Sequence, residues 1–455
     1  MRLYKSILAA SILLFLLLAT SIPGSFALAS FAQSAPSSFV PGPVIDLSND
    51  TRSAETPVIA QYGNNTYVVW SEKPLGQHTE TLFRASQDKG HSFGSILNIS
   101  NDNGTSFEPK IAVSTTNVYI VWRDNTPGNF HIYFKASHVN GTKFKPVIDL
   151  SNHPSVQTGV SIGPVLAATG RHVYVAWSLK TSTSQDIFFS ASHNNGSSFK
   201  LPIDLSNGTG QAIGADIVSS ANHVFVTWDS VVGKNHEAFF TVSRDNGTTF
   251  SSPFNVSNNT GISLEPVLAV FRNSVYVVWR DNKPGNYDIF FRASHDFGAT
   301  FGTVVNLSND PGLSSEATVS AIGSYVYVTW RDDTTGNNQI YFTSSSDNGT
   351  NFGLPRNLSL DTGSSGSNTT GPQMAVFGSK LYIVWPDNTP GSYEVYLSAS
   401  ADNGTTFSLP VNLSNNPGDS GSRGLGSVAF GRSAAVTWVD NSTGKDQIFF
   451  SVGLQ

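Results

Sequence analysis

The chain contains no cysteine, which excludes disulfide bonds, thiolate metal sites, thioether-linked haem and a lipid-modified N-terminal cysteine. Charged residues are also scarce. They make up 13% of the sequence, the net charge is −6, and no run of Lys and Arg occurs beyond the extreme N-terminus. Because clustered Lys and Arg supply most of the affinity for nucleic acid, we expect no nucleic-acid partner. Without disulfides, an exported chain depends on its core and its topology for stability.

The hydrophobic run at the N-terminus is short. Residues 7–19 are apolar but too few for a comfortable membrane span, and Arg2 and Lys5 precede them. Small residues further on offer cleavage sites, so residues 1–32 are predicted to be a signal peptide. We therefore expect a secreted, extracellular or cell-surface protein with no stable membrane span after cleavage. The alternative is a signal that is kept as an anchor.

What the chain does have is a repeat. Each of its eight tryptophans ends a short apolar segment such as Val275–Trp279, and they recur at intervals of 51 to 55 residues. A period near 50 residues with several short strands per unit indicates a β-propeller or a related repeat array. The tryptophans are Trp70, Trp122, Trp177, Trp228, Trp279, Trp330, Trp385 and Trp438.

The unit is clearest over residues 265–309. Residues 265–270 predict a first strand (A), and residues 275–279 predict a second strand (B) with two apolar faces. After a turn rich in Asn, Pro and Gly, residues 288–294 predict a third strand (C), and residues 304–308 an outer strand (D). Four antiparallel strands per unit define the blade of an all-β propeller.

The two ends of the repeat are complementary. Strand D follows strand C seven times, but the eighth unit stops after its C strand, Gln447–Val452. A matching segment, Val44–Ser48, stands ahead of the first A strand. We expect this N-terminal strand to complete the last blade, which closes an eight-bladed ring and removes two exposed sheet edges. The propeller is then one domain over residues 43–455, behind a short linker at 33–42.

The turn between strands C and D carries the motif Ser-x-Asp-x-Gly-x-Ser/Thr-aromatic, as at Ser243–Phe250. It occurs seven times, and Val139 and Asn194 replace the Asp in two copies, which we expect to keep the shape with fewer side-chain bonds. Asp can bond its own turn backbone, Gly supplies positive φ, and Phe can fill the gap between sheets. The motif resembles the Asp-box, or bacterial neuraminidase repeat, of sialidase-like propellers. In that family it lies opposite the active site, so its residues are not catalytic candidates.

The resemblance implies a sialidase as one hypothesis. That family uses three Arg to hold the substrate carboxylate, a Tyr–Glu nucleophile pair, an Asp acid/base and a Phe/Tyr-Arg-Ile-Pro segment, and its characterised sialidases have six blades. No Arg-Ile-Pro occurs here, and most tyrosines stand at a repeat position three residues before a Trp. No catalytic residue is therefore assigned, and a sialidase-like exo-glycoside hydrolase remains the alternative function.

Three units carry an Arg directly after the Trp, an Asp after that Arg, and a Glu fourteen residues before the Trp. The other five units lack both the Arg and the Glu. Because strands A and B form a hairpin, we expect each Glu to lie beside its Arg in one blade. The alternative is a carboxylate clamp of three converging Arg. These candidate binding residues are Arg123 with Asp124, Arg280 with Asp281 and Arg331 with Asp332, and the Glu partners are Glu108, Glu265 and Glu316.

The repeat breaks in the B–C connection of the fourth unit, residues 229–237. His236 and Glu237 there are candidate binding residues with acid–base or metal chemistry, although no second His or carboxylate stands at ligand spacing. The alternative is a solvent-facing loop. No cofactor or metal is expected, and Ca²⁺ on Asp- and Asn-rich turns is a minor option because no twelve-residue calcium loop is present.

The candidate residues all belong to the face built from the B–C and D–A connections. The sequence thus favours a secreted or cell-surface binding or scaffold propeller that recognises a glycan or an extracellular protein, without sialidase catalysis. A surface-layer or matrix component is a third hypothesis.

Overall fold

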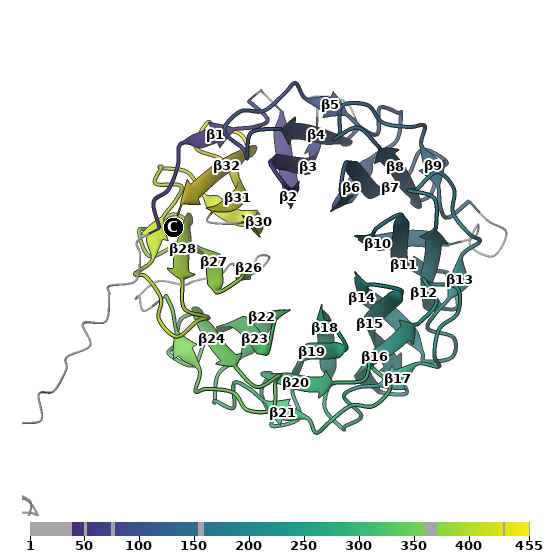
Figure 1. Ribbon diagram of the computed structural model, residues 1–455, viewed down its shortest axis with the longest axis vertical. Helices are drawn as coiled ribbons and strands as arrows, with labels where there is room; N and C mark the ends of the chain where they lie inside the picture. Colours follow the sequence, from purple (N-terminus) through teal and green to yellow (C-terminus); the bar gives the residue numbers. More distant parts are fainter. Residues whose placement is uncertain are drawn as a thin grey trace, which may run out of the picture. The chain divides into compact units, whose positions relative to one another are not determined.

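A computed structural model of the chain describes residues 39–49, 52–73, 78–152, 159–359, 371–430 and 433–454. All regular secondary structure in these ranges is β-strand, arranged as eight four-stranded antiparallel sheets around a central axis (Figure 1). The predicted all-β, eight-bladed propeller is therefore confirmed. The predicted signal peptide and most of the predicted linker lie outside the described residues.

Each blade contributes one strand to each of four layers, and blades are numbered here by their inner strands in chain order. The inner strands are β2 (Ser53–Tyr62), β6 (Ser106–Ser114), β10 (Val160–Thr169), β14 (Gln211–Ser220), β18 (Ser263–Phe271), β22 (Ser314–Ile322), β26 (Gln373–Phe377) and β30 (Ser420–Phe430). The second strands are β3 (Asn65–Lys73), β7 (Asn117–Asp124), β11 (His172–Lys180), β15 (His223–Val232), β19 (Ser274–Asp281), β23 (Tyr325–Asp332), β27 (Lys380–Asp387) and β31 (Ser433–Asp440).

The two remaining layers complete the blades. The third strands are β4 (Glu80–Ser86), β8 (His131–Ser137), β12 (Gln185–Ser192), β16 (Asn235–Ser243), β20 (Asp288–Ser294), β24 (Gln339–Ser345), β28 (Glu394–Ser400) and β32 (Gln447–Leu454). The outer strands are β5 (Leu97–Asn98), β9 (Ile148–Asp149), β13 (Ile203–Asp204), β17 (Phe254–Asn255), β21 (Val305–Asn306), β25 (Arg356–Asn357), β29 (Val411–Asn412) and, for blade 8, β1 (Val44–Asp46).

The core lies between blades rather than within them. All eight tryptophans are fully buried. Trp279, for example, packs beside Phe290 of its own blade, with ring centroids 6.1 Å apart, and joins a cluster that includes Phe225 and Phe240 of blade 4. Because each apolar cluster draws on two neighbouring blades, the repeat of Trp reflects a packing requirement that recurs around the ring.

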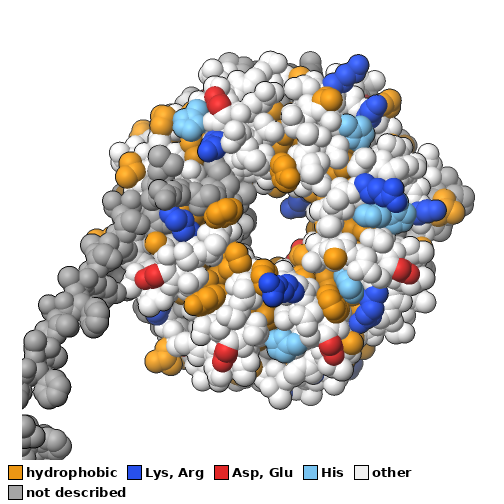
Figure 2. Space-filling model, viewed as in Figure 1, with side chains coloured by type: hydrophobic (Ala, Val, Ile, Leu, Met, Phe, Trp, Pro, Cys, Tyr) orange, Lys and Arg blue, Asp and Glu red, His pale blue; other side chains and the backbone are white. Residues whose placement is uncertain are grey.

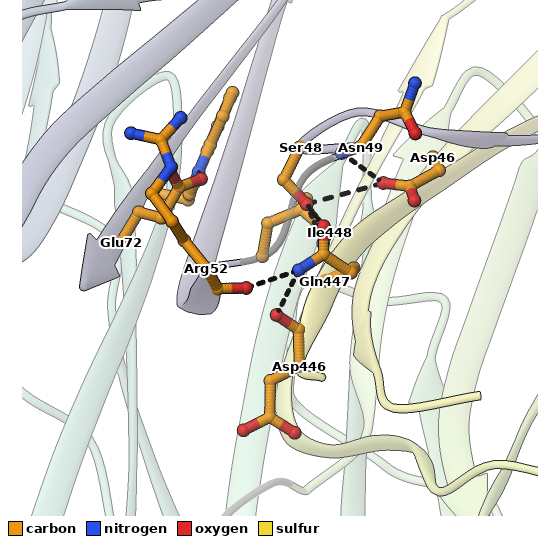
Figure 3. A network of polar contacts seen from close by, with 9 residues as sticks. Asp46, Ser48, Asn49, Arg52, Glu72, Asp446, Gln447 and Ile448 are labelled. Carbon is orange, nitrogen blue, oxygen red and sulfur yellow. Dashed lines mark hydrogen bonds and ion pairs between the residues drawn. The ribbon is translucent and has the colours of Figure 1, made fainter. Parts of the chain in front are cut away.

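The N-terminal strand closes the ring as predicted. Strand β1 pairs antiparallel with β32, with Val44 opposite Ser451. The Ser48 hydroxyl then donates to Oε1 of Gln447 (2.9 Å) and accepts the backbone N–H of Ile448 (2.9 Å) (Figure 3). This Ser-to-backbone bond recurs after the outer strand of every other blade, so the first strand of the chain occupies a normal outer-strand position in the last blade.

The outer strands are shorter than the predicted segments. Apart from β1, they pair with the third strand over two residues only, as β17 does with β16. The reason is the Ser that follows. Oγ of Ser257 accepts the N–H of Ala238 (2.9 Å) and replaces a further strand carbonyl. Such short edges limit strand-to-strand aggregation between molecules.

The Asp-box-like turns have a shared geometry. Asp245 accepts hydrogen bonds from Oγ of Ser243 (2.8 Å) and from the backbone and side chain of Thr249 (2.9 and 2.7 Å). The N–H of Asn246 donates to the carbonyl of Asn222 in the turn between the first and second strands (2.8 Å). The motif turns therefore lie on the face of these A–B turns, opposite the B–C and D–A connections.

The two turns in which another residue replaces the motif Asp differ from each other. Val139 offers only backbone groups to its turn, so the prediction of fewer side-chain bonds is confirmed there. The same prediction is wrong for Asn194. Its Oδ1 accepts from Ser192 Oγ (2.9 Å) and the N–H of Ser198 (3.0 Å), and its Nδ2 donates to Ser198 Oγ (2.8 Å). An amide can supply both the acceptor and, through its NH₂, a donor in place of the second carboxylate oxygen.

Candidate functional site

Apart from β26, the inner strands carry a bulge or irregularity near the start of the strand, at the mouth of the central channel. The register of β6 against β7 shifts between Phe107 and Lys110, and Glu108 between them has a φ of 53°. Glu265 and Glu316 have φ values of 55° and 54° at the equivalent positions. Positive φ is costly for residues with a side chain, so the surrounding ring must hold these glutamates in place.

Each of the three predicted Arg lies beside its own Glu, within one blade, and the prediction of structural pairs is confirmed. The antiparallel pairing of the first two strands brings the side chains together. The distances from Arg Nη2 to Glu Oε1 are 3.1 Å for Arg123 and Glu108, 2.8 Å for Arg280 and Glu265, and 3.4 Å for Arg331 and Glu316.

Aromatic rings just before the third strand support two of these pairs. The guanidinium carbon of Arg123 lies 4.7 Å from the ring centroid of Phe130. The equivalent distance from Arg280 to Tyr287 is 5.0 Å. A guanidinium between a carboxylate and a ring face gains both ion-pair and cation–π attraction, which fixes it inside its own blade.

The carboxylates also connect neighbouring blades. Oε2 of Glu108 accepts the backbone N–H of Gly163, at the bulge of blade 3, over 2.9 Å. Glu316 packs so closely on Gly371 that a Cβ there would lie 2.7 Å from its Oε2. Burial raises the pKa of Glu316, and Arg331 opposes this shift. We conclude that the Glu–Arg pairs help to set the spacing of the blades at the channel mouth.

Blade 4 holds Gly214, Asp229 and His236 at the three positions that carry Glu, Arg and an aromatic ring in blades 2 and 5. Oδ2 of Asp229 accepts the N–H of Glu265 at the next bulge (3.4 Å), as Glu108 does for Gly163. Burial raises the pKa of Asp229 to about 6. Within the described residues, Oδ1 of Asp229 and Nδ1 of His236 are buried without a hydrogen-bond partner. The hydroxyls of the repeated tyrosines, such as Tyr67 and Tyr119, are also buried without a partner, so this feature alone does not mark a functional site.

The B–C connection of blade 4 is a β-hairpin rather than an irregular loop, and its tip at Val232, Gly233 and Lys234 is exposed to solvent. The flanking strands extend to Val232 and from Asn235, and only two residues form the turn. Gly233, with a φ of 67°, supplies the positive φ that a tight hairpin requires. Glu237 is buried and accepts hydrogen bonds from Ser257 Oγ (2.6 Å) and Asn235 Nδ2 (2.9 Å), whereas His236 is half-buried.

The aspartates that follow the three Arg are fully buried. Each accepts a hydrogen bond of 2.6 Å from a serine near the start of the inner strand, and its other oxygen accepts a backbone N–H of the B–C turn. Their carboxylates therefore shape the turns. The serine–aspartate pairs are Ser106 with Asp124, Ser263 with Asp281, and Ser314 with Asp332.

The tyrosines that precede the tryptophans are also structural. They are fully buried between blades, where desolvation disfavours the phenolate. Burial raises the pKa to about 12 for Tyr67, Tyr119, Tyr174 and Tyr382. These phenols are remote from solvent and poorly suited to act as nucleophiles.

A cavity of about 610 Å³ occupies the channel mouth. Several bulge residues line it, among them Glu108, Gly163 and Gly214, together with Lys110 and Leu425. Figure 2 shows that an opening runs along the centre of the ring. In the described part of the chain, no three His, Cys, Asp or Glu side chains are grouped so as to hold a metal ion.

The comparisons with known proteins concern the fold. No family model matches the sequence, and no curated protein matches it. The polysaccharide lyase Uly1 has a TM-score of 0.50 at 8% identity, over 76% of this chain and 90% of its own. A prolyl endopeptidase gives 0.49 at 13% identity over 86% of this chain and 54% of its own. A Trypanosoma rangeli sialidase mutant gives 0.46 at 11% identity, over 92% of this chain and 60% of its own.

Sialidase-like β-propellers are thus among the structural neighbours, but at these identities the similarity describes the fold alone. The chain spans about half to three-fifths of the length of the prolyl endopeptidase and the T. rangeli sialidase. No helix among the described residues is long and apolar enough to cross a membrane.

Sequence reasoning missed the bulges and the position of Lys110. A signal for the bulges was present, because four of the bulge residues precede a Pro, which has no N–H to donate to a strand ladder. These dipeptides are Thr56-Pro57, Glu108-Pro109, Gly163-Pro164 and Glu265-Pro266.

Proposed function

We propose that this chain is a secreted or cell-surface binding propeller of the Asp-box type, which recognises a glycan or an extracellular protein without sialidase catalysis. The observation that carries the proposal is the pairing of each candidate Arg with a Glu of its own blade. A carboxylate clamp needs guanidinium groups whose charge is available to the ligand. Here that charge is balanced by Glu and used to position the blades.

The binding surface is the face of the B–C and D–A connections, around the channel mouth. It carries the bulges, the partly exposed carboxylate of Glu265 and the unsatisfied pair Asp229 and His236. The opposite face consists of A–B turns and Asp-box turns, where motif aspartates such as Asp245 and Asp296 are engaged in hydrogen bonds of their own turns. Asymmetric recognition therefore belongs to the first face.

One observation favours the alternative, a sialidase-like exo-glycoside hydrolase. Asp229 is buried beside the channel mouth, and its pKa of about 6 suits a general acid. The recurring tyrosines argue against this function because their phenols are buried between blades.

A fluorogenic sialoside separates the two functions. We expect no turnover above the protein-free rate for the folded wild-type chain. The Arg280→Ala variant tests the candidate site, and Arg244→Ala, on the Asp-box face, is the matched control. Turnover that Arg280→Ala abolishes in folded protein, and that Arg244→Ala retains, would establish the hydrolase. A glycan array and a panel of extracellular proteins then identify the ligand.

Export is part of the same proposal. The signal is expected to be removed to leave a mature N-terminus between Ser30 and Ser34. Intact-mass measurement of exported protein determines this end directly, and a retained Met1 would show an anchor instead.

A further inference from the structure

Lys110 is the one basic side chain among the described residues that line the channel-mouth cavity. It lies on β6, two residues after the bulge at Glu108. No other blade has Lys or Arg at this position, so the repeat did not generate it. The equivalent residues are Val58, Val165, Asp216, Val267, Thr318, Gln373 and Gly426.

The charge of Lys110 is available to a ligand. Its side chain is exposed to the channel and forms no ion pair with any described residue. Its carboxylate neighbours are engaged elsewhere. Glu108 binds Arg123 and the N–H of Gly163, and Asp216 accepts the N–H groups of Ile217 and Leu268, each over 2.9 Å.

The protein that surrounds the channel lowers the pKa of Lys110 by desolvation, while Glu108 and Asp216 oppose the shift. An amine in such surroundings gains more from an anionic partner than an amine on an open surface. A ligand with one negative charge would therefore stabilise the ammonium group of Lys110, which desolvation otherwise destabilises.

The rest of the cavity wall defines the body of the ligand. Its apolar side chains come from Pro, Val, Ile, Ala and Leu residues of several blades, and Thr56, Glu108 and Gln373 add polar groups between them. No aromatic ring occurs among the described lining residues. A sugar ring would find no aromatic face to stack on among these residues. A phosphate would place its second negative charge near Glu108 and Asp216. A ligand with one carboxylate and an aliphatic body fits both the single positive charge of Lys110 and the apolar side chains of the wall.

We propose that the channel mouth binds the C-terminal residue of an extended peptide, with its terminal carboxylate paired to Lys110 and an aliphatic last side chain against the Pro and Val residues. A volume of about 610 Å³ is sufficient for such a chain end. This inference rests on the proposed binding function and names the ligand class for the same face.

Calorimetric titration of the full chain with two probes tests the proposal. The probes are an acetylated tripeptide that ends in Leu with a free carboxylate, and the same peptide with a C-terminal amide. We expect the acid to bind at least about tenfold more tightly than the amide, which corresponds to about 1.4 kcal/mol. Lys110→Met should abolish this difference, and Lys143→Met, on the Asp-box face of the same blade, should preserve it. Thermal melts establish that both variants are folded.

Equal affinity for acid and amide, or an unchanged preference in folded Lys110→Met, would overturn the proposal. Binding of a uronate oligosaccharide that depends on Lys110, without peptide binding, would also overturn the peptide assignment. If neither probe binds while a ligand from the glycan array or protein panel does, the inference fails and the proposed function stands.

Discussion

The hydroxyl of Ser48 accepts a hydrogen bond from the backbone N–H of Ile448, 400 positions later in the sequence. Nε2 of Gln447 donates to the carbonyl of Arg52 (2.5 Å), so the next stretch of the N-terminal segment is bound as well (Figure 3). In a repeat ring stabilised by contacts between neighbours, these bonds couple the first blade to the last.

Ser48→Ala should destabilise the protein by about 1–3 kcal/mol, because the buried N–H of Ile448 loses its acceptor. Urea unfolding measures the loss. Ser206→Ala is the matched control, since it removes the same bond, to Ile187 (3.0 Å), inside a blade made of consecutive strands. Deletion of residues 33–49 should further lower the melting temperature or cause aggregation. Unchanged stability of the deletion would rule out closure through this strand.

Gly247→Ala should cost more stability than Gly63→Ala. Both glycines have positive φ, 78° and 62°, so each alanine pays about 1–2 kcal/mol for the backbone alone. A Cβ at Gly247 would also lie 2.8 Å from the Phe189 ring, whereas Gly63 has nothing within 4 Å. Comparing the two urea midpoints isolates the packing contribution. Equal losses would mean that the Asp-box glycine is required for φ only.

Asp310→Asn should stabilise the protein at neutral pH. The Asp310 carboxyl faces that of Asp332, and in the corresponding place of blade 8 the amide of Asn416 donates to Asp440 (2.6 Å). Burial, opposed by Thr334 and supported by Asp332, raises the pKa of Asp310 to about 6.

The raised pKa of Asp310 makes the folding stability depend on pH. The stabilisation from Asp310 is complete below its unfolded pKa, near 3.9, and is lost as the pH rises through about 6. Asp310→Asn should therefore gain about 1 kcal/mol at pH 7.5, after allowance for solvent screening, and almost nothing at pH 4. The reverse change, Asn416→Asp, should destabilise at pH 7.5. Melting curves of both variants that shift equally at the two pH values would contradict the paired-carboxyl interpretation.

Val139→Asp should stabilise blade 2 by about 0.5–1 kcal/mol, because it restores turn hydrogen bonds at a half-exposed site without removing a buried side chain. Asn194→Asp is the control and should change little, since the amide already makes the corresponding bonds. Thermal unfolding distinguishes the two. A loss of stability in Val139→Asp would show that the motif Asp does not contribute to these turns.

Much of the architecture was predictable because the repeat exposes it. The spacing of Trp279 from its neighbours fixes the blade length, and the orphan segment at Val44 predicts closure. The pairing of Glu265 with Arg280 was predictable because a unit has either both Glu and Arg at these two repeat positions or neither of them. These inferences come from comparing the eight repeat units of the one sequence with one another.

The remaining features depend on interactions between elements. The positive φ of Glu108 is no local preference of Glu and is held by the bond to the next blade. The outer strand ends early because the hydroxyl of Ser257 replaces a carbonyl. Lys110 has no counterpart in other units, so comparison between units could not reveal where it points.

The most direct test of the central claim, binding without hydrolysis, is mass spectrometry of ligands recovered from the folded protein. The chain is incubated with sialylated and neutral glycans and with the candidate protein ligands, and bound and free fractions are analysed. The account predicts that bound ligands are recovered intact, with no more free sugar than in the protein-free control. Release of sialic acid by the wild-type chain, lost in folded Arg280→Ala, would contradict it.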